Sequence, residues 1–236
     1  SGKFKAKLNG SPADDFPKTP EIKKGSKWQI DSKTFQAAIT KTIFCAALDE
    51  GRAVLTGVLF EANKKGLTLA ATDGFRLSVV DLPIKGETDE VKFILPAKAL
   101  FEASRLLTEP SFDLSFFSET NLVVFDLGDI KIYSRVIAGN YPDYEKIIPS
   151  ISTTKIVVSS DELLKTIRLA SVFARDSANI VKLKIKSGKL KISANAPQVG
   201  ENESEMDVQV EKGEDEDVVV AFNYRYFLDL LNGVGS

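Results

Sequence analysis

The stretch LTLAATDGFRL, residues 67–77, decides the fold. Apolar and polar side chains alternate before the Asp73-Gly74 pair, which is the period of a half-buried β-strand. Asp-Gly between two such runs is a strong signal for a tight hairpin. Together with Leu55–Ala62, the runs Gly66–Ala71 and Phe75–Leu82 therefore predict an antiparallel meander.

The same texture returns at long intervals along the chain. LKISAN, residues 190–195, resembles LTLAATD and places Asn195 122 residues after Asp73. VAFNYRYFL, residues 220–228, follows the similar FILPAKALF, residues 93–101, by 127 residues, and the aromatic-Pro pair of GSPADDFP, residues 10–17, returns in GNYP, residues 139–142. A period of about 125 predicts three copies of one unit. We expect the tail of the first copy in 1–24, a complete copy in 25–150, and a third copy in 151–236 that stops before its end.

Each copy is expected to be an α+β domain, with two helices packed on antiparallel sheet. In the complete copy one helix is predicted over 32–48, capped by Asp31 or Ser32, and another over 96–107 that begins with Pro96 as its first residue. In the third copy a helix is expected over 160–174. The remaining strands of the complete copy are predicted at Trp28–Asp31, Val91–Leu95, Ser111–Phe117, Leu122–Leu127 and Ile130–Ile137.

The composition excludes several classes of protein. The 236 residues are 43% hydrophobic and 27% charged, as in ordinary globular proteins, and they include one cysteine and no histidine. Histidine-based catalysis, an internal disulfide and a zinc site of thiolates and imidazoles are therefore excluded. The longest apolar runs fall far short of the roughly 20 residues that cross a bilayer. We expect a cytoplasmic protein with no membrane, metal or cofactor.

Charge is unevenly distributed along the chain. Residues 201–217 hold nine acids and one lysine, so the net charge of −2 leaves +6 for the rest. The acidic run predicts a solvated loop at a hairpin tip rather than a metal site. The outward faces of the expected helices carry basic residues, which are either scattered solubilising charges or a surface that contacts phosphates without reading bases. These are Lys33, Lys41, Lys98, Arg105, Lys165 and Arg168.

No motif supports catalysis. Neither a phosphate-binding loop nor a Gly-x-Gly-x-x-Gly pattern occurs. Ser152 and Lys155 have a serine-lysine spacing, but four-residue patterns arise easily by chance and Lys155 begins an expected strand. Asp14-Asp15 has no second acidic cluster to complete a metal site. We therefore expect a protein that is not an enzyme.

Five motifs in order carry a family resemblance. LTGVLF (55–60), ATDGFRL (71–77), GNYPDY (139–144), SAN (193–195) and FNYRY (222–226) resemble the bacterial DNA polymerase III beta subunit, or sliding clamp. The resemblance covers essentially the whole chain, from the end of the first clamp domain to most of the third. It implies a head-to-tail homodimeric ring of six similar domains, with helices lining a central hole. The ring would hold duplex DNA by encircling it, without sequence preference.

The resemblance also implies a peptide-binding pocket between the second and third domains. Its expected partners are the DNA polymerase III alpha subunit, other polymerases and the clamp-loader delta subunit. Apolar walls with a few polar groups suit such an anchoring peptide. The matching positions are Leu55, Thr72, Gly74, Phe75, Arg76, Leu77, Pro142, Lys146, Ile147, Asn223 and Tyr226.

The chain departs from the family pattern in places. Phe75 stands where many relatives have His, and Lys146 replaces a frequent Arg, whose planar fork Lys cannot reproduce. The family's C-terminal strand and tail would follow Ser236, so we expect the pocket of this chain to be incomplete and the chain alone not to close a ring. The functional hypothesis is a processivity factor. The alternative is an adaptor that binds the same peptides and never surrounds DNA.

Overall fold

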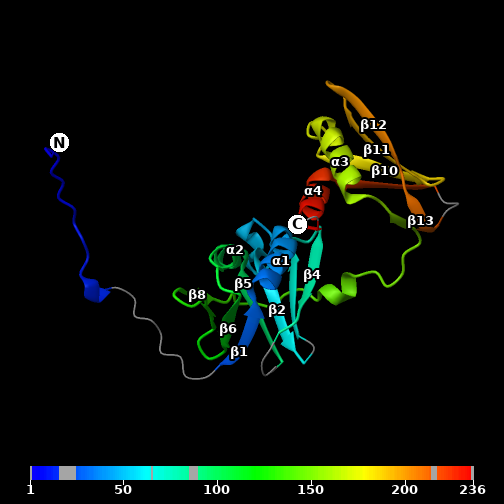
Figure 1. Ribbon diagram of the computed structural model, residues 1–236. Helices are drawn as coiled ribbons and strands as arrows, with labels where there is room; N and C mark the ends of the chain where they lie inside the picture. The colour runs from blue at the N-terminus through cyan, green and yellow to red at the C-terminus, as the bar shows by residue number, and fades with distance from the viewer. Residues whose placement is uncertain (1, 16–24, 65, 85–89, 214–216, 235–236) are drawn as a thin grey trace.

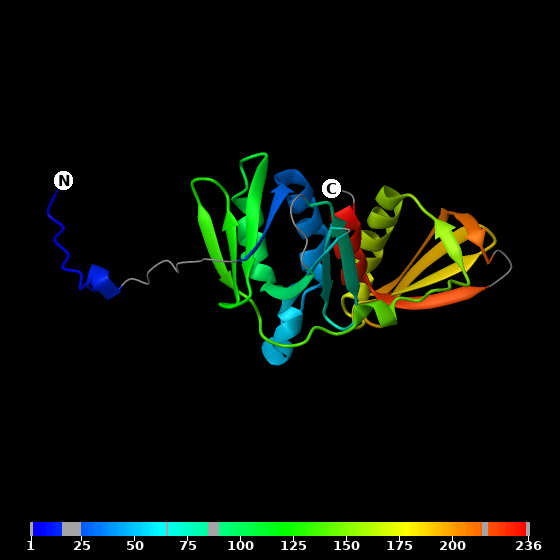
Figure 2. The ribbon, with the colours of Figure 1, turned by 90° about the horizontal axis from the view of Figure 1, so that it is seen from below.

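The computed structural model describes residues 2–15, 25–64, 66–84, 90–213 and 217–234 (Figure 1). Residues 2–15 are exposed, contain one 3-10 turn, η1 (Ala13–Asp15), and extend away from the rest of the molecule (Figures 1 and 2). The Phe16-Pro17 pair that suggested a first copy lies outside the described residues. The remaining chain forms a middle unit and a C-terminal unit, each with its own hydrophobic core.

The middle unit contains two four-stranded antiparallel sheets. The first has the order β1-β6-β7-β8, and the second has the order β4-β3-β2-β5, which is the predicted meander with β5 added. Ile137 N donates to Ile94 O at 2.8 Å, so the segment after β8 reaches the edge strand β5. The strands are β1 (Ser26–Asp31), β2 (Gly57–Asn63), β3 (Gly66–Thr72), β4 (Leu77–Leu82), β5 (Val91–Pro96), β6 (Ser111–Phe117), β7 (Leu122–Asp126) and β8 (Lys131–Arg135).

Two helices cover one side of these sheets, α1 (Ser32–Thr42) and α2 (Ala97–Arg105). The Asp31 carboxylate accepts from Thr34 N at 2.8 Å, so Asp31 is the N-cap of α1. The helix is shorter than predicted, because a 3-10 turn, η2 (Ile43–Cys45), follows it and the backbone at Ala46 is extended. The prediction that Pro96 is the first residue of the second helix was wrong by one position. Pro96 ends β5 and is the N-cap of α2.

The core of the middle unit is built largely from aromatic rings. Trp28, Phe35, Phe60 and Phe125 are fully buried. The Phe93 ring stacks with those of Phe116 and Phe60 at centroid distances of 4.4 and 5.2 Å. Such offset stacking adds to the free energy of burial. Because Phe60 and Phe93 belong to one sheet and Phe116 to the other, these contacts join both sheets in one core.

The C-terminal unit repeats the second sheet and both helices of the middle unit. Its main sheet has the order β12-β11-β10-β14, which matches β4-β3-β2-β5 strand for strand. The register repeats as well, since Ile180 pairs with Asn223 where Gly57 pairs with Pro96. The elements are β9 (Lys155–Val157), α3 (Ser160–Ala174), β10 (Ile180–Lys186), β11 (Lys189–Ala196), β12 (Gly200–Asp207), β13 (Gln209–Lys212), β14 (Val218–Asn223) and α4 (Tyr224–Val234).

The prediction that the acidic run is a loop was wrong for most of its length. Residues 200–207 form strand β12, and β13 pairs with β9; residues 214–216 lie outside the described part. Acidic side chains alternate with Asn202, Ser204 and the buried Met206, which is the period of a strand. The acids face lysines of β11, with ion pairs of 2.5 Å (Lys189–Glu205) and 2.6 Å (Lys191–Glu203).

Candidate functional site

A groove of 390 Å³ lies where α1 and β4 of the middle unit meet β14 and α4 of the C-terminal unit. Most of its wall is aliphatic or aromatic, and several of these side chains remain open to solvent, among them Phe75 at 80% and Leu230 at 46% exposure. Exposed apolar side chains that gather in a concave site are typical of an interaction surface. The lining residues are Lys41, Phe44, Cys45, Phe75, Arg76, Leu77, Ser78, Val79, Val80, Phe222, Tyr226, Phe227, Leu230 and Gly233.

The turn between β3 and β4 presents Phe75 to this groove. Asp73 Oδ1 accepts from Phe75 N at 2.9 Å and from Arg76 N at 3.1 Å, while Thr72 Oγ1 accepts from Gly74 N at 3.0 Å. Gly74 has φ +93°, a backbone conformation that residues other than glycine rarely adopt. The side chains of Thr72 and Asp73 thus hold the turn that the Asp-Gly pair begins.

Arg76 joins the two units. Its Nε donates to Asp73 at 3.0 Å, and its Nη1 donates to Asp229 of α4 at 2.5 Å. The guanidinium also lies 4.6 Å from the centre of the Tyr226 ring, a distance that allows a cation–π contact. Burial opposes its charge, but the hydrogen bonds to Asp229 and Asp73 outweigh this and raise the pKa of Arg76. Arg76 is therefore part of the contact between the units, with only 19% of its side chain exposed.

Two side chains from other parts of the chain also contact the β3–β4 turn: Tyr141 of the segment between the units, and Arg52. The Tyr141 hydroxyl accepts from Thr72 N at 2.9 Å, and burial raises the pKa of Tyr141 to about 12, so the phenol stays neutral at ordinary pH. Arg52 Nη2 donates to Asp73 O at 2.8 Å. The wall of the groove is thus fixed by side chains that come from three separate parts of the chain.

Comparison with known proteins shows the family to which the chain belongs. Residues 29–143 match the family model of the DNA polymerase III beta subunit, central domain, and residues 145–236 match that of its C-terminal domain. The chain belongs to the DNA polymerase III beta subunit family. The groove described above therefore lies at the junction of the family's central and C-terminal domains.

Individual relatives agree with this assignment. Beta sliding clamps of Streptococcus pneumoniae and Staphylococcus epidermidis are 31% and 29% identical over the whole chain. A crystal structure of the Bacillus subtilis sliding clamp has a TM-score of 0.89 at 31% identity and covers 99% of this chain, and one of the Thermotoga maritima beta subunit has 0.86 at 33% and covers 94%. The chain spans 62% of the length of these two curated relatives, and 62% and 60% of the two crystallised chains. The sequence-based resemblance and the clamp-domain fold are confirmed.

The residues that the family resemblance assigned to peptide binding divide into two groups. Phe75, Arg76, Leu77 and Tyr226 line the groove, and the centroids of the stacked Phe75 and Tyr226 rings lie 6.5 Å apart. Leu55 and Thr72 are buried and do not line the groove, and Gly74 shapes the turn. The peptide-binding role of all of them stays a prediction.

The other assigned residues lie outside the groove. Pro142 lines a different cavity on the outer face of the middle unit. Lys146 pairs with Asp143 at 2.7 Å, and Ile147 is exposed on the connecting segment. Asn223 Oδ1 accepts from Arg225 N at 3.0 Å where α4 begins.

Several lining residues were missed from the sequence. Leu230 follows Phe227 by three residues and Tyr226 by four, a helical spacing that could have identified this face of α4. Phe44 and Cys45 lie in the 3-10 turn η2, where the sequence predicts a longer helix. Burial raises the pKa of the Cys45 thiol to about 12, so this side chain is a neutral, apolar part of the wall.

The basic residues assigned to DNA are not all equivalent. Lys33, Lys98 and Lys165 are exposed on their helices. Arg105 pairs with Glu102 at 3.5 Å, and Arg168 Nη2 donates to Asn232 at 3.4 Å. Lys41 is half-buried and lines the groove.

Two further features concern metals and membranes. Within the described ranges, no group of three or more Cys, Asp or Glu side chains is arranged to hold a metal ion. In the same part of the chain, no helix is long and apolar enough to span a membrane.

Proposed function

We propose that this chain supplies the central and C-terminal domains of a DNA sliding clamp, a processivity factor without catalytic activity that encircles duplex DNA in the cytoplasm. The observation that carries the proposal is the apolar groove at the junction of two repeated domains in a chain of this family. The ring is proposed for the chain completed to the length of its relatives.

The helices provide the surface proposed to face DNA. Exposed cations on α1, α2 and α3 can contact phosphates, which carry no sequence information. A ring that surrounds the duplex does not need tight electrostatic binding, and strong binding would slow sliding. A net charge of −2 is compatible with such topological retention.

The groove provides the surface proposed to bind partners. An apolar or aromatic anchor of a linear peptide would displace solvent from Phe75, Leu230 and the rings beneath them. The proposed partners are the DNA polymerase III alpha subunit, other polymerases and the clamp-loader delta subunit. Tethering the polymerase keeps its local concentration at the primer end high, which is the basis of processivity.

Topology separates this function from that of an adaptor with the same groove. The completed protein is loaded on a nicked circular plasmid with a clamp loader and ATP, and its retention is measured before and after the circle is linearised. Loss of the protein on linearisation is expected for an enclosing ring. Retention on linear DNA would refute encirclement and favour direct binding.

A further inference from the structure

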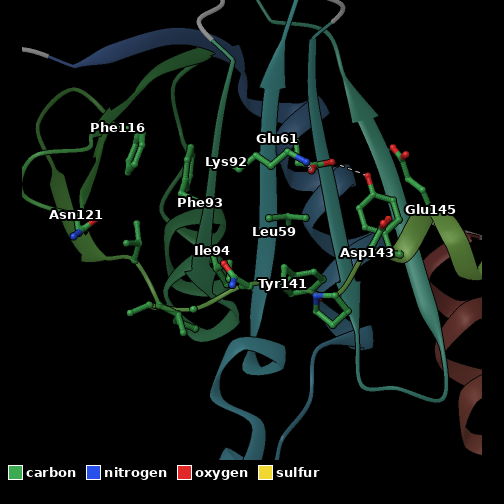
Figure 3. Close-up of a pocket in the computed structure, with 17 residues that line it drawn as sticks. Leu59, Glu61, Lys92, Phe93, Ile94, Phe116, Asn121, Tyr141, Asp143 and Glu145 are labelled. Atoms are coloured by element: carbon green, nitrogen blue, oxygen red, sulfur yellow. Dashed lines mark hydrogen bonds and ion pairs between the residues drawn. The ribbon is translucent and has the colours of Figure 1, made fainter.

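A second cavity, of 730 Å³, lies on the outer face of the middle unit (Figure 3). Strands β2 and β5 form its floor, and the connecting segment 136–145 forms one wall. Its volume lies within the range of roughly 300–1,000 Å³ that is usual for binding sites. Among the described residues it shares no side chain with the groove.

The floor of this outer cavity is apolar. Leu59, Phe93, Ile94 and Phe116 line it, and each is at most 7% exposed. Such side chains offer water no hydrogen bonds, so an apolar group of a ligand is favoured there over solvent.

Part of this floor also has a structural role, because Leu59 and Ile94 pack with Ala70 and Tyr144 in a small buried cluster. Leu59 of β2 pairs with Ile94 of β5, two residues along from the Gly57–Pro96 pair. The equivalent pair of the C-terminal unit, two residues along from Ile180–Asn223, is Lys182 with Ala221. One copy of the repeat therefore has an apolar outer face where the other has a charged one. Tyr144 and Tyr141 of the connecting segment pack on part of the apolar face, and the remainder faces the cavity.

The rim of the outer cavity is acidic. Three carboxylates line it, those of Glu61, Asp143 and Glu145, against one ammonium group, that of Lys92. Glu61 is held by Lys92 and by the Tyr144 hydroxyl, which donates to it at 2.8 Å, and Asp143 pairs with Lys146. Glu145 is exposed and makes no ion pair with any described residue. Figure 3 shows Asp143 and Glu145 at one end of the cavity and Asn121 at the other.

We propose that the outer cavity docks a peptide segment of a partner protein in which a Lys or Arg side chain stands beside an apolar or aromatic one. The cation lies against Glu145 and Asp143, and the apolar side chain lies on Leu59 and Ile94, which form a cross-strand pair. Charge complementarity at the rim and the apolar floor together select this chemistry. Because the rim is exposed, the affinity is modest and decreases with salt.

The chain contains its own reporter for this test. Trp28 is the only tryptophan, and its ring lies 6.2 Å from that of Phe93, which lines the floor. The probe is a capped synthetic peptide with two arginines flanking a phenylalanine, and the matched control has glutamates in place of the arginines. We expect a saturable change in Trp28 fluorescence with the arginine peptide and at least tenfold weaker binding of the glutamate peptide.

Charge reversal locates the binding site. Glu145→Lys is expected to weaken binding of the arginine peptide at least fivefold. Asp129→Lys makes the same change in charge in the β7–β8 turn, at the end of that hairpin away from Asn121, and is expected to leave binding unchanged. Both side chains are exposed, so both variants should keep the wild-type circular dichroism spectrum. Absence of saturable binding, equal binding of the two peptides, or equal effects of the two substitutions would overturn the proposal.

Discussion

The ion pair between Arg76 and Asp229 should hold the two domains together at the groove. A hydrogen bond to a charged group contributes about 1.5–3 kcal/mol when it is desolvated, and an exposed ion pair contributes about 0–1 kcal/mol. Arg76 has 19% and Asp229 44% of its side chain exposed, with 2.5 Å between Nη1 and Oδ2. The pair lies between these limits, and we expect a coupling energy of about 1 kcal/mol.

A double-mutant cycle measures this coupling. Arg76→Ala, Asp229→Ala and the double variant are unfolded in urea together with the wild type, and unfolding is followed by circular dichroism for both units and by Trp28 fluorescence for the middle unit. The Arg76 contacts with Asp73 and the aromatic rings are lost on both arms of the cycle and cancel. The coupling should decrease in 1 M salt because of screening. A coupling energy within about 0.3 kcal/mol of zero would refute the role of this pair as an interdomain link.

Further predictions concern the groove, the helices, the core and pH. Phe75→Ala should weaken binding of the DNA polymerase III alpha subunit about tenfold or more, as for an interface hot spot, with an unchanged melting temperature because Phe75 is 80% exposed; a parallel loss of stability would argue against direct contact. Reversing the charges of Lys98 and Arg105 should shorten retention of the completed protein on circular DNA, and an unchanged lifetime would count against their facing the hole. Ile167→Ala should lower the free energy of unfolding by about 2–5 kcal/mol, since Ile167 is fully buried in the C-terminal core. Burial raises the pKa of the Cys45 thiol from 9.0 to about 12, so its contribution to stability is complete below pH 9 and is lost as pH rises toward 12. In urea unfolding from pH 8 to 11, Cys45→Ala should therefore lose less stability than the wild type, and identical slopes would contradict this.

The sequence was sufficient to predict elements that are controlled by local rules. The Asp73-Gly74 turn and the strand at 111–117 follow from turn chemistry and the pattern of apolar residues, and the helix at 160–174 follows from its apolar stripe; the structure contains all three. Where two signals competed, the prediction was wrong. The density of carboxylates in 201–207 obscured their alternation, and apolar residues after Thr42 suggested a helix that the extended backbone at Ala46 ends.

The candidate site was harder to predict, because it depends on contacts between distant segments. The Arg76–Asp229 pair spans 153 residues and the Tyr141–Thr72 hydrogen bond spans 69, and neither leaves a local signal. The family resemblance identified Phe75, Arg76, Leu77 and Tyr226 but not Asp229. Asp229 forms an ion pair with the guanidinium of Arg76, which the resemblance assigned to peptide binding. Local patterns determine which strands and helices form, whereas the packing of whole domains determines which of their side chains meet.

The repeat shows how one fold can carry different surfaces. In both units the same strand order and register are maintained by side chains that face the helices, such as Phe60 in β2 and Val181 and Leu183 in β10. The outward positions face away from these helices, and in the middle unit Leu59 and Ile94 pack against Tyr144 of the connecting segment instead. The outward positions have diverged to Leu59 and Ile94 in one unit and to Lys182 and Ala221 in the other. Because inward residues maintain the fold in both copies, the outward residues can differ without a change of strand order, and in the middle unit they form part of the floor of the proposed docking cavity.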